Sequence, residues 1–295
     1  MTTVPQTPAR WLTEAEIEAF HTDGAVVLRD VISAQWLAQI EEGVEYVLAH
    51  PSVLAEATAV LGGGGFSGDA FMWKTHQVFH DFIHHSPAAR LAQQLFGSRR
   101  INAFYDQIFA KPAGNGKPTP FHEDVSSWPV SGDQLCAMWI ALDPCTPDQA
   151  ALQVVRGSHR WPPGRAIPVT PTAADLQLAG QSGDRDAEVT ELLSWELEPG
   201  DLVLFHPRAV HGATGTGSER GRRAFVSRWA GDDVVFDPRH AVLPLLWEHG
   251  LKPGDPIGGS MFPQVLPAQA DGTWCGPEQP DAAKAADFIE ILRLL

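Results

Sequence analysis

The stretch INAFYDQIFAK, residues 101–111, decides the fold class, because the pattern of the sequence changes here from helical to β. Short apolar runs follow it, separated by turns that are rich in Pro, Gly and Asp: QLCAMWIALD (134–143), ALQVVRGSH (151–159), DLVLFH (201–206) and RRAFVSRWAG (222–231). Many short apolar runs at such spacing are typical of an all-β sandwich or barrel. The sequence therefore predicts a mainly β core.

The residues before this stretch have helical patterns instead. LTEAEIEAFHTDG (12–24) predicts a helix that begins with a capping box, formed by Thr13 as the N-cap and Glu16 three residues later. Gly24 is placed to end that helix. A strand and two more helices are expected along the rest of this part, over 25–32, from Ser33 to about Pro51, and over 86–97.

The chain is expected to form a single domain, since no linker or internal repeat divides its 295 residues. Residues 1–100 are predicted to form a mostly helical flank that packs on a β core over 101–235. Residues 236–295 are rich in Pro and Gly and have few periodic runs. They are expected to form a C-terminal wrap or lid.

Composition narrows the class of partner. Lys and Arg number 21 against 36 Asp and Glu, and the net charge is -15. A nucleic-acid-binding protein needs clustered basic residues, so a small-molecule partner is expected. No apolar run reaches the ~18 residues of a membrane span, and the N-terminus lacks the pattern of a signal peptide. The 3 cysteines have no CxxC spacing, which predicts reduced thiols in a cytoplasmic protein.

The segment TPFHEDVSSW, residues 119–128, contains two good metal ligands one residue apart. In a strand, residues i and i+2 point to the same face, so His122 and Asp124 would project together. The competing interpretation is a turn in which Asp124 caps backbone groups of Ser126 or Ser127. A bare HxD does not decide between the two, because short motifs often occur by chance.

A third ligand is available downstream, in GDLVLFHPRAVHGATG (200–215). This segment contains His206 and His211, and spacing alone does not choose between them. Two histidines and one carboxylate form the facial triad of non-haem Fe(II) oxygenases, which leaves metal positions open for other ligands. The basic pair Arg222 and Arg223 follows, and either guanidinium could hold the carboxylate of an acid bound to the metal.

Several segments together resemble the phytanoyl-CoA dioxygenase family of Fe(II)/2-oxoglutarate oxygenases, and the likeness covers most of the chain. They are LTEAEIEAFHTDGAVVLRDVIS (12–33), DQIFAKPAGNGKPTPFHED (106–124), VVRGSHRW (154–161), PGDLVLFHPRAVHG (199–212) and RRAFVSRWAGDD (222–233). The resemblance implies a double-stranded β-helix core of the jelly-roll or cupin type, with N-terminal helices packed on it and the metal inside one mouth.

The resemblance also implies the ligands. His122, Asp124 and His211 match the metal-binding and catalytic residues of the family, while His206 matches a histidine that is not a ligand. Some relatives are halogenases in which a small residue replaces the aspartate. Because Asp124 is intact, halogenation is disfavoured.

Co-substrate contacts follow from the same resemblance. Arg222 matches the arginine that binds the far carboxylate of 2-oxoglutarate, with Arg223 as the near alternative. Lys74 and Trp139 fall where the family places further co-substrate contacts. The middle motif departs from the family pattern, with Gln149-Ala-Ala-Leu followed by Arg156-Gly-Ser-His. This departure concerns the turn geometry and not the metal.

These residues predict an Fe(II)- and 2-oxoglutarate-dependent dioxygenase that uses O2 and releases succinate and CO2. The expected reaction is hydroxylation or desaturation of a small metabolite or natural-product intermediate, because the scarcity of basic residues disfavours a CoA ester. One alternative is a cupin-like hydrolase or isomerase with zinc on the same triad. Another is a non-catalytic β-sandwich binding protein. Metal analysis and a 2-oxoglutarate titration would separate the three.

Overall fold

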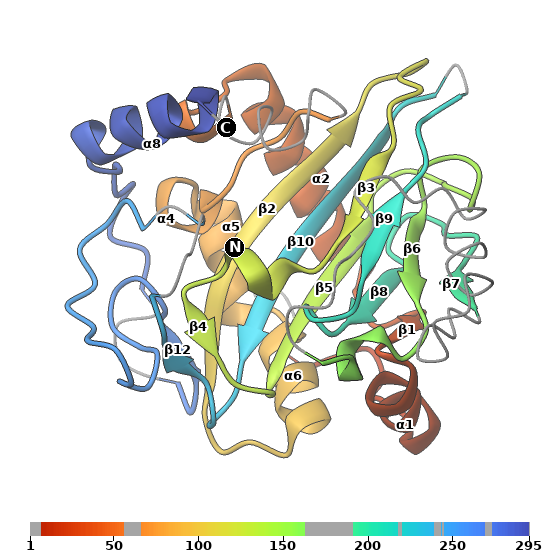
Figure 1. The fold of residues 1–295 in the computed structure, drawn as a ribbon, viewed down its shortest axis with the longest axis horizontal. Helices are drawn as coiled ribbons and strands as arrows, with labels where there is room; N and C mark the ends of the chain where they lie inside the picture. Colours follow the sequence, from red (N-terminus) through yellow and green to blue (C-terminus); the bar gives the residue numbers. More distant parts are fainter. Residues whose placement is uncertain are drawn as a thin grey trace.

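Two antiparallel sheets form the centre of the molecule (Figure 1). The computed structural model describes residues 7–55, 66–162, 191–217, 220–238, 243, 245–268 and 273–294. The larger sheet has the order β1 (Ala25–Leu28), β8 (Leu202–Phe205), β5 (Leu135–Ala141), β10 (Arg222–Ala230), β2 (Ile101–Lys111) and β12 (Gln264–Leu266). The smaller sheet has the order β3 (Thr119–His122), β9 (His211–Ala213), β6 (Leu152–Val155) and β7 (Leu192–Ser194), and a separate ribbon pairs β4 (Val130–Ser131) with β11 (Val235–Phe236).

Strand β5 shows how the larger sheet separates two cores. All of its residues are buried, as expected for a strand that is covered on both faces. Because side chains alternate along a strand, Met138 packs among the helices behind the sheet, whereas Trp139 packs among residues of the smaller sheet. The expected jelly-roll arrangement of two facing sheets with helices on one side is therefore confirmed.

Helices cover the outer face of the larger sheet (Figure 1). The described helices are α1 (Glu14–Asp23), α2 (Ala34–Ala49), α4 (Met72–Thr75), α5 (Gln77–His85), α6 (Ala88–Phe96) and α8 (Ala282–Leu294). Phe79 and Phe82 of α5 contact Phe225 of β10, with ring centroids 5.3 and 5.2 Å apart. None of the helices within the described ranges is long and apolar enough to cross a membrane.

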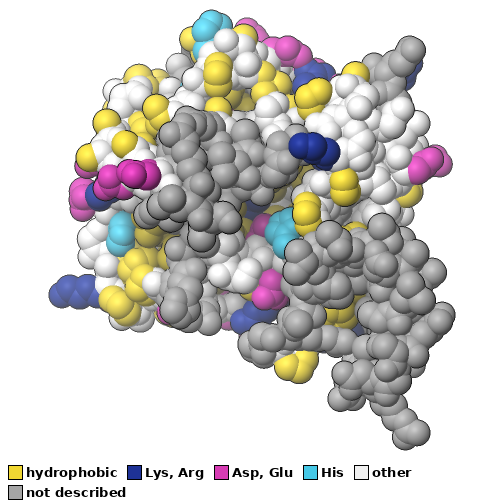
Figure 2. All heavy atoms as spheres, turned by 45° about the horizontal axis from the view of Figure 1, so that its top comes forward, with side chains coloured by type: hydrophobic (Ala, Val, Ile, Leu, Met, Phe, Trp, Pro, Cys, Tyr) yellow, Lys and Arg dark blue, Asp and Glu magenta, His cyan; other side chains and the backbone are white. Residues whose placement is uncertain are grey.

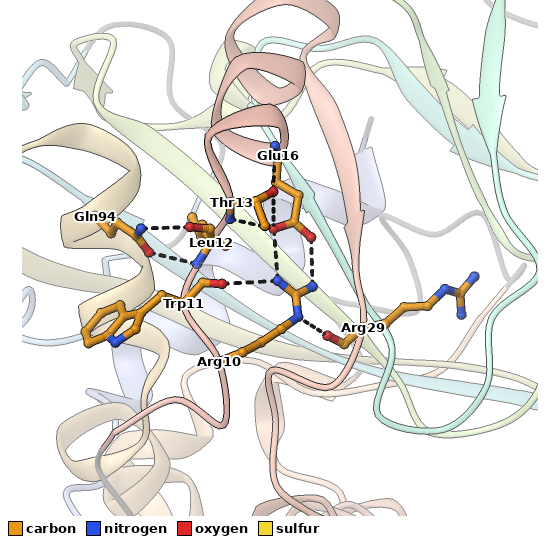
Figure 3. A network of polar contacts seen from close by, with 7 residues as sticks. All are labelled: Arg10, Trp11, Leu12, Thr13, Glu16, Arg29 and Gln94. Carbon is orange, nitrogen blue, oxygen red and sulfur yellow. Dashed lines mark hydrogen bonds and ion pairs between the residues drawn. The ribbon is translucent and has the colours of Figure 1, made fainter.

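The capping box of α1 is confirmed, and a network of polar contacts holds it in place (Figure 3). Thr13 and Glu16 exchange the two expected hydrogen bonds. The Arg10 guanidinium donates to Glu16 and to the backbone carbonyl of Arg29 just past β1. Gln94 of α6 pairs with both backbone groups of Leu12, at 2.9 Å each. These contacts fix the direction in which the chain leaves α1 and enters the sheet.

Both edges of the larger sheet come from outside the predicted β core. β1 lies in the N-terminal flank and pairs with β8, and β12 lies in the C-terminal part and pairs with β2. The strand expected over 25–32 ends at Leu28, because Asp30 adopts a left-handed conformation with φ 59°. The helix expected over 86–97 is α6, and Pro87 stands at its N-cap.

The carboxyl of Asp106, in β2, predicts that the free energy of unfolding depends on pH. Its carboxyl is fully buried and accepts a hydrogen bond from the backbone N–H of Trp73 at 3.0 Å. Burial raises the pKa of Asp106 to about 8. The folded chain therefore keeps a proton that the unfolded chain releases above a pKa of about 4.

We expect the free energy of unfolding to fall as pH rises from about 4 to 8, by up to about 1.4 kcal/mol per pH unit from this group. The variant Asp106→Asn lacks this titration, so its stability relative to the wild type should increase over the same range. Urea unfolding of both proteins at pH 5 and pH 8 measures the difference. An equal difference at the two pH values would contradict a buried, protonated Asp106.

Candidate metal centre

The structure brings His122, Asp124 and His211 together, although they come from separate parts of the chain. His122 ends β3 and lies opposite His211 of β9, while Asp124 begins the short 3-10 helix η1 (Asp124–Ser127). The three side chains offer ligand atoms that all lie within 4.8 Å of one another. Oδ1 of Asp124 is 3.4 Å from Nε2 of His122 and 3.7 Å from Nε2 of His211.

The expectation that one strand carries both His122 and Asp124 is wrong in detail. β3 ends at His122, and the Asp124 backbone N–H donates to the Pro207 carbonyl at 2.9 Å instead of continuing the sheet. Glu123 between them is still extended, with φ -110° and ψ 137°, so the two side chains project to the same side. In the turn, Ser127 donates its hydroxyl to the Asp124 backbone carbonyl, and among the described residues no backbone N–H donates to the Asp124 side chain.

Backbone carbonyls orient both imidazole rings. Nδ1 of His122 lies 2.8 Å from the Pro120 carbonyl, and Nδ1 of His211 lies 2.8 Å from the Ala209 carbonyl. A carbonyl can only accept, so Nδ1 carries a proton in both rings, and Nε2 is the ring nitrogen that can face a metal. Such contacts are the usual support of metal-binding histidines.

The charge states also suit a cation. Burial lowers the pKa of His211 to about 4, helped by the neighbouring His122. Burial also opposes ionisation of Asp124, but the His122 hydrogen bond and the nearby cationic groups outweigh it and hold the pKa of the carboxyl well below its usual range. Oδ2 of Asp124 is buried and lacks a hydrogen bond. A buried carboxylate beside the Nε2 atoms of two imidazole rings is a fitting donor set for Fe(II).

His206 is not part of this group. It is buried, and both of its ring nitrogens are engaged. Nε2 lies 3.1 Å from the Asp133 carbonyl, and Nδ1 accepts from the Arg208 backbone N–H at 3.1 Å. Geometry therefore separates His206 from His211, which spacing could not do.

A cavity of about 350 Å³ opens beside the triad. Arg222 and Trp139 both line it, and the Arg222 guanidinium lies 5.2 Å from the centre of the Trp139 ring. Arg222 is buried and donates to the Ala150 and Phe109 carbonyls at 3.0 and 3.2 Å. Burial lowers its pKa to about 10, so the side chain remains a cation. The cavity therefore holds a cation as well as a metal-binding triad.

The family model that matches this chain is that of phytanoyl-CoA dioxygenase, over residues 20–224. The chain belongs to the phytanoyl-CoA dioxygenase family. A probable phytanoyl-CoA dioxygenase of Caenorhabditis elegans is 29% identical over 165 residues, which are 53% of this chain and 52% of that protein. The chain thus matches about half the length of this curated relative. The ectoine dioxygenase of Sphingopyxis alaskensis is 25% identical over 234 residues, 72% of this chain and 75% of that protein.

Solved structures confirm the fold. The epimerase SnoN, in complex with Fe3+, alpha ketoglutarate and nogalamycin RO, superposes with a TM-score of 0.68 at 21% identity, over 85% of this chain and 98% of that one. EctD from S. alaskensis with 2-oxoglutarate and 5-hydroxyectoine gives a TM-score of 0.62 at 20% identity, over 86% and 90%. The double-stranded β-helix expected from the family resemblance is therefore the observed fold.

Arg222 and Arg223 are neighbours in β10, so their side chains point to opposite faces of the strand. Arg223 forms ion pairs with Asp143, at 2.7 Å, and with Glu45 of α2. It does not line the cavity beside the triad. Between the two candidate arginines, only Arg222 faces this cavity.

Lys74 is not among the residues that line this cavity. Its buried Nζ forms an ion pair with Glu278 at 2.6 Å and lies 4.6 and 5.5 Å from the ring centres of Trp73 and Trp247. The backbone N–H of Glu278 also donates to the Lys74 carbonyl at 2.8 Å. Lys74 therefore holds the C-terminal segment, and the structure does not bring it to Arg222 and Trp139.

We expect Lys74→Met to leave 2-oxoglutarate affinity unchanged and to loosen the C-terminal segment. Because Glu278 is largely exposed, the loss of stability should be about 1 kcal/mol. Hydrogen exchange would report faster exchange of the amides over 273–288, and a titration with 2-oxoglutarate provides the control. Weaker 2-oxoglutarate binding without faster exchange would instead support a co-substrate contact.

Arg228 is a residue of the cavity that was not predicted from the sequence. It lines the cavity together with Arg222 and Val226, all on the same face of β10. The sequence did contain an indication of Arg228. Every second residue of a strand points to the same face, so Arg228 shares the face of Arg222, which was already a candidate. Arg228 lies outside the residues 20–224 that the family model matches, and the resemblance implied no role for it.

The charge of the visible surface agrees with the composition. Figure 2 shows one face on which Lys and Arg side chains form separate spots among hydrophobic and uncharged ones. Within the described part of that face, they do not form a continuous basic surface.

Proposed function

We propose that this protein is an Fe(II)- and 2-oxoglutarate-dependent dioxygenase that oxidises a C–H bond of a small molecule. The observation that supports it most is one cavity with a His-Asp-His triad and a buried arginine. A triad alone suits several metals and reactions. A buried guanidinium in the same cavity adds a partner for a carboxylate, which a co-substrate with two acid groups requires.

In this proposal, His122, Asp124 and His211 hold the metal through Nε2, Oδ1 and Nε2. Arg222 binds the far carboxylate of 2-oxoglutarate, and the Trp139 ring packs against that guanidinium. Bound iron, 2-oxoglutarate and O2 supply the oxidising power, and succinate and CO2 are released. The protein positions the reactants and excludes water.

The substrate occupies the other part of the cavity in this proposal. Side chains there are mostly apolar and include Leu54, Phe71, Trp128, Leu243 and Phe288. Such a lining favours a small molecule with an apolar body over a polyphosphate ester. We propose hydroxylation as the reaction, with desaturation as the alternative outcome of the same hydrogen abstraction.

The partner in this proposal is a small metabolite, rather than a nucleic acid or a membrane. A cytoplasmic location fits two free cysteines, Cys136 and Cys145, that are buried as thiols. Burial raises the pKa of both thiols, which keeps them protonated and unreactive.

Anaerobic calorimetry with Mn(II) and 2-oxoglutarate, followed by succinate measurement with Fe(II) and O2, tests the proposal. We expect 2-oxoglutarate to bind only to the metal-loaded protein, because the metal and Arg222 each hold one end of it. Candidate small molecules should then increase Fe(II)-dependent succinate formation. Tight zinc binding without any 2-oxoglutarate binding would favour a metal hydrolase or isomerase, and absence of both would favour a binding protein.

A further inference from the structure

The two oxygens of Asp124 have different surroundings. Oδ1 lies close to Nε2 of both His122 and His211, so it faces the position of the metal. Oδ2 is buried and forms an ion pair with Arg228, in which 3.5 Å separates Oδ2 from Nε. Among the described residues, no hydrogen bond reaches Oδ2. Arg228 therefore stands behind the oxygen that faces away from the metal.

Arg228 is held firmly in this place. The side chain is only 3% exposed, and its guanidinium carbon lies 4.1 Å from the centre of the Tyr105 ring and 5.6 Å from that of Trp128. These two rings are themselves joined by a hydrogen bond from Trp128 Nε1 to the Tyr105 hydroxyl at 3.2 Å. Nη2 of Arg228 donates to Oε1 of Gln107 at 3.1 Å. A cation that packs on two aromatic rings and is hydrogen-bonded at one end has little freedom to follow Asp124 if the carboxylate turns.

The number of oxygens that Asp124 gives to the metal decides how many positions stay open. A carboxylate that binds through both oxygens fills two positions, so with two imidazoles it leaves two of six. 2-Oxoglutarate chelates through two atoms, and no position would remain for O2. Binding through one oxygen leaves three open positions, which the chemistry needs.

We propose that Arg228 is a positioning residue that restrains Oδ2 of Asp124, so that only Oδ1 binds the metal. The inference rests on the proposed function, since it concerns the same metal site. It adds a role for a residue that is neither a ligand nor an anchor of 2-oxoglutarate. It also explains why a cation is buried beside a metal site, where its charge opposes metal binding.

The test compares Arg228→Met with Arg223→Met, which removes an ion-paired arginine from the opposite face of the same strand. Mn(II) and then 2-oxoglutarate are titrated into each protein. For Arg228→Met we expect 2-oxoglutarate to bind about tenfold more weakly, because a second Asp124 oxygen on the metal competes with the co-substrate for the open positions; tenfold is the size typical of a lost orienting contact. Mn(II) affinity should change by less than about threefold, because lost orientation and relieved charge repulsion act in opposite directions.

Co(II) provides a second readout, because its visible absorption depends on the number of bound atoms. The spectrum of Co(II)-loaded Arg228→Met should differ from the wild type before 2-oxoglutarate is added, and that of Arg223→Met should not. Arg228→Lys keeps the charge and part of the contact, so its 2-oxoglutarate affinity should lie between wild type and Arg228→Met. If Arg228→Met does not fold, the same measurements are made on Arg228→Lys.

Three results would overturn the inference while leaving the proposed function intact. They are an unchanged 2-oxoglutarate affinity, a parallel loss of Mn(II) and 2-oxoglutarate binding, and a Co(II) spectrum identical to the wild type. If instead the wild-type protein bound neither Mn(II) nor 2-oxoglutarate, the proposed function itself would fail. Thermal unfolding of every variant shows whether a lost affinity reflects a lost fold.

Discussion

His211→Ala should lower Fe(II)-dependent succinate formation by more than about 100-fold, because losing a residue that only orients a metal ligand already costs about 10- to 100-fold. His211 supplies one of the three atoms that lie within 4.8 Å of one another, and two ligands hold a metal far less firmly than three. Mn(II) titration should show weakened metal binding in the same variant, and activity should not return at higher 2-oxoglutarate concentration. The effect is thus expected on the metal and not on the co-substrate.

His206→Ala is the matched control. His206 is a buried histidine of the same segment, and its nitrogens are engaged with Asp133 and Arg208 rather than with the triad. Its loss should lower the free energy of unfolding but leave Mn(II) affinity intact. If His206→Ala lost metal binding and His211→Ala kept it, the assignment of the third ligand would be reversed.

Arg222→Leu should weaken 2-oxoglutarate binding by about 100-fold, or roughly 3 kcal/mol, as expected when one partner of a buried charge pair is removed. Metal affinity should be almost unchanged, because the guanidinium lies beside Trp139 and is not a ligand. Arg222→Lys should recover only part of the affinity, since an ammonium group lacks the planar fork that pairs with a carboxylate. Calorimetric titration of the metal-free proteins with Mn(II), and of the Mn(II)-loaded proteins with 2-oxoglutarate, measures these affinities.

Arg223→Leu provides the comparison on the neighbouring residue. It breaks the ion pairs with Asp143 and Glu45 at the protein surface, so a small loss of stability and normal 2-oxoglutarate affinity are expected. The opposite result, with Arg223→Leu defective and Arg222→Leu normal, would move the anchor to the other face of β10.

Local patterns predicted local structure well. The capping box at Thr13 and Glu16 and the left-handed Gly24 follow from a few neighbouring residues, so sequence was enough to place α1. The sequence correctly predicted that Asp124 lies on the same side as His122, but it wrongly placed Asp124 within the strand. The pattern shows that two side chains share a face, but only the contact with the Pro207 carbonyl ends the strand before Asp124.

Long-range contacts account for what was missed. Lys74 pairs with Glu278, and Arg228 meets Asp124, across distances along the chain that no spacing rule covers. The edge strand β12 belongs to a segment with little β pattern, and its pairing with β2 brings together parts of the chain that are far apart in sequence. Spacing alone did not separate His206 from His211; the family resemblance did, and the contacts of their ring nitrogens agree with it.

The C-terminal segment has a consequence for how such a protein can change over generations. The family match ends at residue 224, whereas Leu243 and Phe288, which line the outer part of the cavity, come later. Replacing or recombining this late stretch would leave the triad and Arg222 untouched. Evolution could therefore change which small molecule binds by altering only the part of the chain after β10, while the triad and Arg222 stay the same. A chimaera of two relatives joined after β10 would make use of the same separation.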